Sequence, residues 1–147
     1  MLEIFELSYR VIPLLDTDFA RMFTHAYSAY MALGRWHYVF GSEFKRAALR
    51  KRWAPVTAAE TIIYKQAIKA FENVLLTTRL LCWDEKRFYL EQIFRVNGEI
   101  RAIAYLEGLL RGPEGHLNPV EVFQILGVEQ KSPPMPESIR QWLTSRS

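Results

Sequence analysis

The stretch THAYSAYMALGRWHYVF, residues 24–40, constrains the fold of this chain more than any other segment. Alanines and large apolar residues run around every side of the helix that it predicts, and the stretch contains no Asp or Glu. A helix that is apolar all round has to be buried. The rest of the chain must therefore supply the layers that cover it.

The segments after this helix predict an antiparallel sheet. Asn97-Gly98 is a strong hairpin signal, because both residues tolerate positive φ. Residues 2–12 predict a further strand ahead of the helix. One strand, a long helix and four strands together predict an α+β fold, in which a curved antiparallel sheet wraps around a long central hydrophobic α-helix. The four later strand runs are residues 56–68, 73–83, 87–96 and 99–111.

Smaller elements complete the predicted domain, residues 1–130. A basic amphipathic helix is expected within residues 42–53, with Phe44, Ala48 and Leu49 facing inward. Gly112-Pro113 is expected to break the sheet, and Asn118 is expected to cap a short helix. Residues 131–147 form a proline-containing C-terminal tail with one last short helix.

Composition narrows the classes of protein to which the chain can belong. The chain has 147 residues, a net charge of +3 and a single cysteine, Cys82, so it forms no internal disulfide and fits a reducing, cytoplasmic setting. The N-terminus lacks the basic region of a secretory signal, and no apolar run is long enough to span a membrane. The excess charge is concentrated within Lys45–Arg52, which favours a small anionic molecule with phosphates over a nucleic acid.

Two stretches carry a resemblance to a known family. YRVIPLLDTDFARMFTHAYSAYMALGR resembles the opening motif of hotdog acyl-CoA thioesterases of the 4-hydroxybenzoyl-CoA thioesterase type, in which an Asp-x-Asp loop precedes the helix. Residues 53–112 look like the thioesterase-like branch with a WDE–FYLEQ signature. The resemblance implies a hotdog fold and acyl-CoA thioester hydrolysis, with coenzyme A as part of the substrate and no cofactor. The chain departs from the family pattern at two positions. The family usually has a glycine where this chain has Arg21, and an asparagine at about the position of Tyr27.

Thioester hydrolysis needs a carboxylate and hydrogen-bond donors for the oxyanion. The unpaired N–H groups at the start of the helix supply such donors. Because the helix itself has no acid, the carboxylate must come from the preceding loop, Asp16 and Asp18, or from a facing strand, Glu60. Asp16 and Asp18 are two positions apart, so in an extended loop they are expected to be neighbours, an arrangement that favours a base.

The resemblance assigns catalysis to Asp18 and matches His25 to the histidine of the family. Asp16, Thr24 and Glu60 are supporting residues. Structural alternatives stand beside each assignment: the aspartates cap a turn or the helix, Thr24 caps the helix, His25 is a structural histidine with its hydrogen bonds satisfied, and Glu60 forms a salt bridge.

Substrate binding is predicted to involve Tyr27, whose bulk narrows an acyl pocket and favours short or medium-chain acyl groups. Arg46, Arg50 and Lys51 are expected to meet the phosphates of coenzyme A, with a solvated helix face as the alternative. No metal site is expected, because the histidines show no metal-ligand spacing.

The exposed edge of the predicted sheet favours a homodimer or a dimer of dimers (a homotetramer). A second function stays open: a non-catalytic hotdog protein that binds acyl-CoA or an acyl carrier protein, as the departures at Arg21 and Tyr27 suggest. A hotdog dehydratase is disfavoured, because those enzymes usually carry their acid on the central helix.

Overall fold

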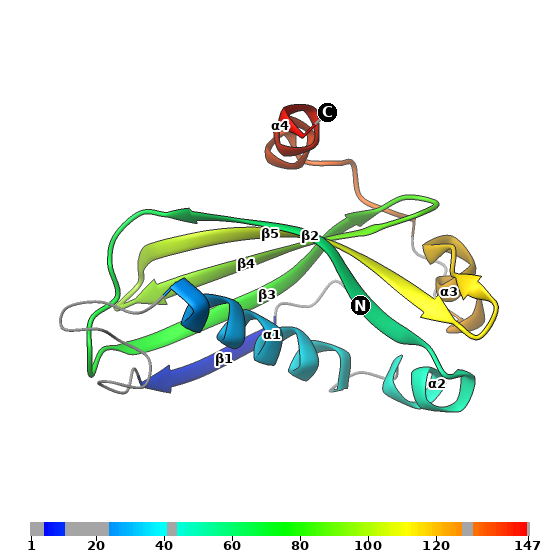
Figure 1. Ribbon diagram of the computed structural model, residues 1–147, viewed down its shortest axis with the longest axis horizontal. Helices are drawn as coiled ribbons and strands as arrows, with labels where there is room; N and C mark the ends of the chain where they lie inside the picture. The colour runs from blue at the N-terminus through cyan, green and yellow to red at the C-terminus, as the bar shows by residue number, and fades with distance from the viewer. Residues whose placement is uncertain (1–4, 11–23, 41–43, 128–130, 147) are drawn as a thin grey trace.

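The computed structural model describes residues 5–10, 24–40, 44–127 and 131–146. Along these residues the elements follow in the order β1, α1, α2, β2, β3, β4, β5, β6, α3 and α4 (Figure 1). The predicted succession of a strand, a long helix, a short helix and a run of strands is confirmed.

The described strands form one antiparallel sheet with the spatial order β1-β3-β4-β5-β2, and β6 pairs with the end of β5. The two outer strands of this order are β1 and β2. The strands are Phe5–Arg10 (β1), Ala54–Tyr64 (β2), Asn73–Trp83 (β3), Phe88–Val96 (β4), Glu99–Gly112 (β5) and Gly115–His116 (β6). The helices are Thr24–Phe40 (α1), Phe44–Lys51 (α2), Pro119–Ile125 (α3) and Glu137–Ser145 (α4).

Short turns with local signals join the three middle strands. Asn97 and Gly98 have φ values of 51° and 79° and form the predicted hairpin turn between β4 and β5. Between β3 and β4, the side-chain Oδ1 of Asp84 accepts the backbone N–H groups of Lys86 and Arg87, each at 2.8 Å. These turns keep β3, β4 and β5 side by side.

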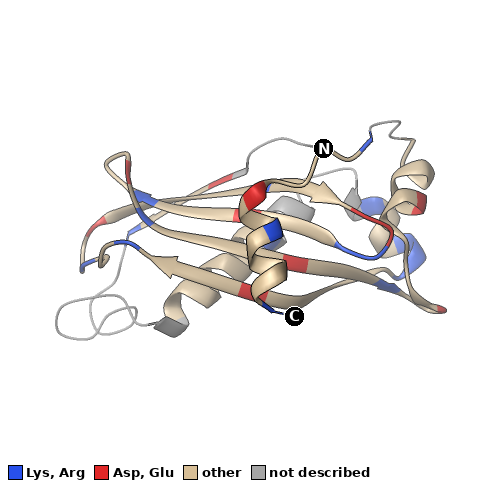
Figure 2. Cartoon of the chain, turned by 90° about the horizontal axis from the view of Figure 1, so that it is seen from above, with Lys and Arg blue, Asp and Glu red and all other residues tan. Residues whose placement is uncertain are grey.

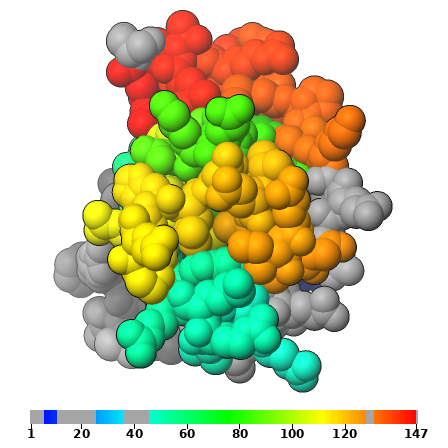
Figure 3. Space-filling view, turned by 90° about the vertical axis from the view of Figure 1, so that its right-hand side faces the viewer, coloured from blue at the N-terminus to red at the C-terminus, as the bar shows by residue number. Residues whose placement is uncertain are grey.

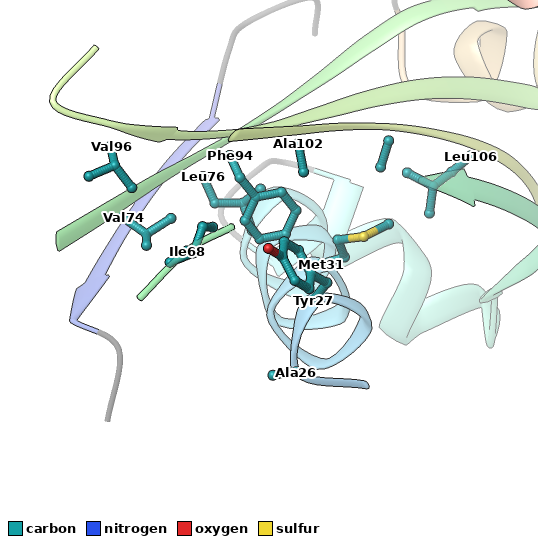
Figure 4. Close-up of a cluster of buried hydrophobic side chains, with 11 residues drawn as sticks. Ala26, Tyr27, Met31, Ile68, Val74, Leu76, Phe94, Val96, Ala102 and Leu106 are labelled. Atoms are coloured by element: carbon teal, nitrogen blue, oxygen red, sulfur yellow. The ribbon is translucent and has the colours of Figure 1, made fainter. Parts of the chain in front are cut away.

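Helix α1 has the predicted bounds, residues 24–40, and lies against one face of the sheet, mainly on β3 and β1 (Figure 1). Met31 of α1 and Phe94 of β4 are fully buried in the cluster between helix and sheet (Figure 4). The far side of α1 is more open, and Leu33 is 43% exposed. A helix that is apolar all round is therefore not fully enclosed by one copy of the described chain.

Helix α4 lies on the opposite face of the sheet from α1 (Figure 1). Ile139 of α4 is fully buried there. At the end of α4, an Arg146 amino group lies 2.6 Å from Glu107 of β5, which also pairs with Arg87 at 3.4 Å. The chain thus covers part of its own outer sheet face. The cluster that Ile139 forms with this face of the sheet also contains Leu81, Cys82, Tyr89, Tyr105, Met135, Trp142 and Leu143.

Helices α2 and α3 pack together at one end of the sheet, next to the β5–β6 hairpin (Figure 3). Asn118 caps α3 as expected, with its Oδ1 accepting the N–H of Val120 at 2.9 Å. On α2 it is Ala47 that is buried and Ala48 half-buried, whereas Leu49 is 67% exposed, so the expected inward position of Leu49 was wrong. The outward face of this short helix therefore carries both basic and apolar side chains.

The expected break of the sheet at Gly112-Pro113 was also wrong. Strand β5 runs through Gly112, and the chain turns back to pair Gly112 with Gly115 and Arg111 with His116. Gly115 has φ 118°, a conformation that glycine adopts without the cost of a side chain. The Gly-Pro pair is thus part of a tight turn.

Candidate functional site

A few polar side chains join the otherwise apolar helix α1 to the sheet. Ser28 and Arg35 are seven positions apart, so they lie on one side of the helix. The hydroxyl of Ser28 donates to Oε1 of Glu60 on β2 at 3.2 Å. Because β2 is an outer strand, this contact lies at the edge of the sheet, near the start of α1.

Gln92 of β4 forms the buried centre of this polar group. Its amide nitrogen donates to the backbone carbonyl of Met31 at 3.0 Å and to the hydroxyl of Thr78 at 2.9 Å. Its carbonyl accepts from Arg35 Nη1 at 3.1 Å. Both hydrogens of the amide are thus used, and the orientation of the side chain is fixed by its partners. Gln92 therefore locks α1 to β3 and β4.

The guanidinium of Arg35 lies between this buried amide and the sheet edge. Burial lowers the pKa of Arg35, and the negative charge of Glu60 opposes that shift. Arginine nevertheless stays cationic at any physiological pH. The helix therefore holds one positive charge that interacts electrostatically with Glu60 of β2.

Gly34 permits this close approach of helix and sheet. A Cβ atom at this position would lie 3.1 Å from the amide nitrogen of Gln92, 3.1 Å from a methyl of Leu76 and 3.2 Å from the hydroxyl of Thr78. All three neighbours are fully buried. A side chain here would push α1 away from the sheet.

The structure places only some of the predicted catalytic residues. Asp16, Asp18 and Arg21 lie outside the described residues. Thr24 and His25 form the first turn of α1, as predicted, although their side chains are also outside the described set. Glu60 points toward α1, and no described lysine or arginine lies within salt-bridge distance of it. Among the described residues, Glu60 accepts a hydrogen bond from Ser28 and interacts electrostatically with Arg35.

Tyr27, in the first turn of α1, points its side chain into the core. Its ring meets Phe94 edge-on at 5.2 Å and Tyr64 of β2 edge-on at 5.0 Å, measured between ring centroids. Ile68 belongs to the same cluster (Figure 4). The first turn of α1 is therefore held by the end of β2 and by the segment that follows it.

The basic residues of α2 lie at the other end of the molecule (Figures 1 and 2). Arg46, Arg50 and Lys51 are exposed, and none of them pairs with a described carboxylate. Within one chain they are separated from the start of α1 by the full 17 residues of that helix, or about 25 Å. The structure thus separates two groups of residues that the sequence assigned to one substrate site.

Other reactive groups of the described chain have ordinary structural roles. Burial raises the pKa of the Cys82 thiol to about 11, and the charge of Asp84 adds to the shift. No three His, Cys, Asp or Glu side chains in the described segments are arranged to hold a metal ion. Across those same segments, no helix has the length and apolar character needed to cross a bilayer.

Comparison with known proteins gives the family. A family model described as the Thioesterase-like superfamily matches residues 12–143. The chain belongs to this superfamily. The resemblance found in the sequence is confirmed, and the matched range includes the start of α1 and most of α4.

Two curated relatives of this thioesterase-like protein are known by the same name. Protein THEM6 of Drosophila melanogaster is 30% identical over 95 residues, which are 63% of this chain and 47% of that protein. Protein THEM6 of Danio rerio is 32% identical over 92 residues, which are 60% of this chain and 43% of that protein. The matches thus span less than half the length of these relatives.

Several solved structures share the fold. The probable thioesterase YbaW from Escherichia coli has a TM-score of 0.77 at 16% identity, over 83% of this chain and 96% of that one. Protein SAV2348 from Staphylococcus aureus, solved in complex with CoA, has a TM-score of 0.71 at 16% identity, over 95% and 93% of the two chains. Slr0204, a 1,4-dihydroxy-2-naphthoyl-CoA thioesterase from Synechocystis, has a TM-score of 0.64 at 14% identity, over 83% and 93%. These likenesses show the α+β hotdog fold.

The sequence analysis missed Ser28, Thr78 and Gln92. A signal for Gln92 was present, because strand alternation puts it on the same face as Leu90 and Phe94, both apolar. A glutamine at a core-facing strand position needs buried partners. The partners of Gln92, Thr78 and Met31, lie 14 and 61 positions away in the sequence, so no local sequence pattern predicts them.

Proposed function

We propose that this thioesterase-like protein hydrolyses the thioester of an acyl-coenzyme A with a short, medium-chain or aromatic acyl group. The observation that carries the proposal is the family match over residues 12–143, which takes in the start of α1. Water adds to the thioester carbonyl, the carbon–sulfur bond breaks, and the products are a carboxylic acid and the free thiol of coenzyme A. No cofactor takes part.

The start of α1 is the proposed site of the chemistry. The first N–H groups of a helix have no partner within it, and they lie at the positive end of the helix dipole. The backbone N–H groups near Thr24 and His25 would stabilise the oxyanion as the carbonyl is attacked. Asp18 takes the proton from the attacking water and returns it to the departing sulfur, or attacks the carbonyl itself. The like charge of the neighbouring Asp16 makes Asp18 a stronger base, and His25 orients the carbonyl.

Glu60 is a supporting carboxylate in this proposal. It hydrogen-bonds Ser28, one helical turn after Thr24. Arg35 lies on the same side of α1 and holds a positive charge near it. Glu60 is thus a described carboxylate in contact with α1 near its start, and it is the substitute for Asp18 as base.

We propose that the protein works as a homodimer joined through β2, with a dimer of dimers as the larger assembly. Strand β2 is an outer strand of 11 residues, and Val56, Ile63 and Tyr64 on it are exposed. A long apolar edge of this kind is a template for pairing with another chain. A two-fold axis beside β2 would pair the strands antiparallel and bring the open side of α1, at Leu33, against the other copy.

The same two-fold arrangement accounts for the basic residues of α2. The two α1 helices would run antiparallel, so the end of one helix, followed by α2, would lie beside the start of the other. Arg46, Arg50 and Lys51 of one copy would then meet the phosphates of a coenzyme A whose thioester is bound at α1 of its partner.

Release of thiol from a panel of acyl-CoAs tests the proposed activity. The proposal predicts turnover of at least one short, medium-chain or aromatic acyl-CoA, and the best substrate defines the acyl pocket. No thiol release across the panel, with acyl-CoA binding retained, would establish the non-catalytic alternative in its place.

Mixing two inactive variants tests the shared site. Asp18→Asn and the double variant Arg46→Glu/Arg50→Glu should each lose activity alone. Refolded together in equal amounts, they should regain about a quarter of the wild-type rate, because half of the dimers then hold one intact site. If the residues belong to one chain's site, the mixture gains nothing.

A further inference from the structure

The connection between β2 and β3, residues 65–72, presents an unusual aromatic residue. Phe71 has φ 67°, in the left-handed region that favours glycine, and its side chain is 68% exposed. It lies in a tight turn in which the N–H of Glu72 donates to the carbonyl of Lys69 at 3.3 Å. A large apolar side chain in this conformation brings no burial that would offset the conformational cost.

The turn that carries Phe71 is firmly held. Arg101 of β5 donates to both carboxylate oxygens of Glu72 at 3.1 Å and to the carbonyl of Ala67 at 2.6 Å. The same carboxylate accepts the backbone N–H of Lys69 at 2.7 Å. Ile68 is fully buried. The backbone on both sides of Phe71 is therefore held in place by hydrogen bonds, while the Phe71 side chain is exposed.

The β2–β3 connection borders the start of α1. Ile68 shares a buried cluster with Ala26 and Tyr27 from the first turns of the helix (Figure 4). Tyr64, at the other side of the connection, meets Tyr27 edge-on at 5.0 Å. The β2–β3 connection and the start of α1 lie at the same end of the molecule (Figure 1). Phe71 therefore lies at the same end of the molecule as the proposed thioester site.

The charges around Phe71 favour an anion. Lys65 and Lys69 are exposed in the same connection, and its one acid, Glu72, is bound by Arg101. Among the described residues, no aromatic ring packs on Phe71. An exposed ring flanked by cations suits a ligand that has both a flat aromatic part and negative charge.

We infer that Phe71 is a binding residue for the nucleotide end of coenzyme A. The planar base stacks on the Phe71 ring, and the phosphate on the ribose of the same nucleotide lies next to Lys65 and Lys69. The diphosphate of coenzyme A is left to the basic side chains of α2 in the other copy. The inference rests on the proposed function, and it makes the protein selective for a coenzyme A thioester over the same acyl group on a carrier that lacks the nucleotide.

The test compares two thioesters of one acyl group, on coenzyme A and on N-acetylcysteamine, which has no nucleotide. Phe71→Ala should raise KM for the coenzyme A thioester about 10-fold, as expected for loss of one base–aromatic stack, and leave kcat unchanged. KM for the N-acetylcysteamine thioester should stay the same. Phe71→Trp should keep the affinity for coenzyme A, because its ring can also stack on the base. Phe71→Gly should lose that affinity but raise the melting temperature, because glycine adopts the left-handed backbone conformation of this position without strain. Ile125→Ala, an equally simple change at an exposed apolar residue of α3, is the control and should alter neither KM.

Equal changes for both thioesters, or no change for either, would overturn the inference. Calorimetric titration with free coenzyme A and with pantetheine separates this failure from a failure of the proposed activity. If the wild type releases no thiol but Phe71→Ala still weakens coenzyme A and leaves pantetheine unaffected, the nucleotide site stands without the hydrolysis. If the wild type binds coenzyme A no better than pantetheine, the nucleotide site is wrong.

Discussion

Replacing Gly34 by alanine adds one methyl group to the side of α1 that meets the sheet. In most exposed helix positions this change stabilises a protein by about 1 kcal/mol, because alanine has the higher helix propensity. At Gly34 the new methyl would lie 3.1–3.2 Å from three buried atoms, on Gln92, Leu76 and Thr78. Gln92 cannot turn aside without losing its hydrogen bonds to Met31 and Thr78.

The two effects oppose each other, and their sizes predict the sign. Adding a methyl to a packed core costs about 1–3 kcal/mol, against a gain of about 1 kcal/mol from propensity. Gly34→Ala should therefore lower the free energy of unfolding by about 1 kcal/mol, and Gly34→Val by at least about 3 kcal/mol.

Urea denaturation followed by circular dichroism measures both variants, with Ala29→Gly on the exposed side of α1 as the control for propensity. That control should lose about 1 kcal/mol. A Gly34→Ala protein that is more stable than wild type by that amount would show that α1 has room for a side chain at this position, contrary to the prediction.

Three further predictions follow from the described contacts. Ile139→Ala should cost about 2–4 kcal/mol in urea denaturation, because Ile139 is the fully buried anchor of α4; an unchanged midpoint would mean that α4 is not docked in solution. Cys82, with its pKa raised to about 11, should react with a thiol reagent at pH 8 only as fast as the protein unfolds, whereas rapid labelling of the native protein would contradict its burial. Arg101→Met should lower the stability to thermal unfolding by about 2 kcal/mol or more, because the Glu72 carboxylate loses the guanidinium that binds both of its oxygens. A loss below about 0.5 kcal/mol would show that Arg101 does not hold the β2–β3 connection.

The fold could be predicted well where its signals are local. The bounds of α1 follow from one apolar stretch, and the β4–β5 hairpin follows from Asn97-Gly98. The position of α4 could not be predicted, because Ile139 is buried by residues from β3, β4 and β5 that lie far from it in the sequence. The prediction for Leu49 failed for a related reason. In an eight-residue helix, more than one side can be read as the apolar face, and packing against α3 buries Ala47.

The candidate site, too, is predicted in part: its residue types follow from the sequence, but its contacts between distant positions do not. The residue types needed for thioester hydrolysis can be found from the sequence, and the start of α1 is where the prediction put it. The contact between Ser28 and Glu60 joins positions 32 residues apart, and the exposed ring of Phe71 depends on a backbone conformation that no pattern in the sequence signals. Distance along the chain, more than chemistry, limits what the sequence predicts.

The most direct test of the proposed function is the kcat of Asp18→Asn beside wild type on the best acyl-CoA substrate, with Glu60→Gln measured under the same conditions. Asp18→Asn should lose at least about 100-fold in kcat, the size expected of a general base, whereas Glu60→Gln should lose clearly less. Activity that survives in Asp18→Asn and is lost in Glu60→Gln would contradict this prediction and move the base from the loop before α1 to β2.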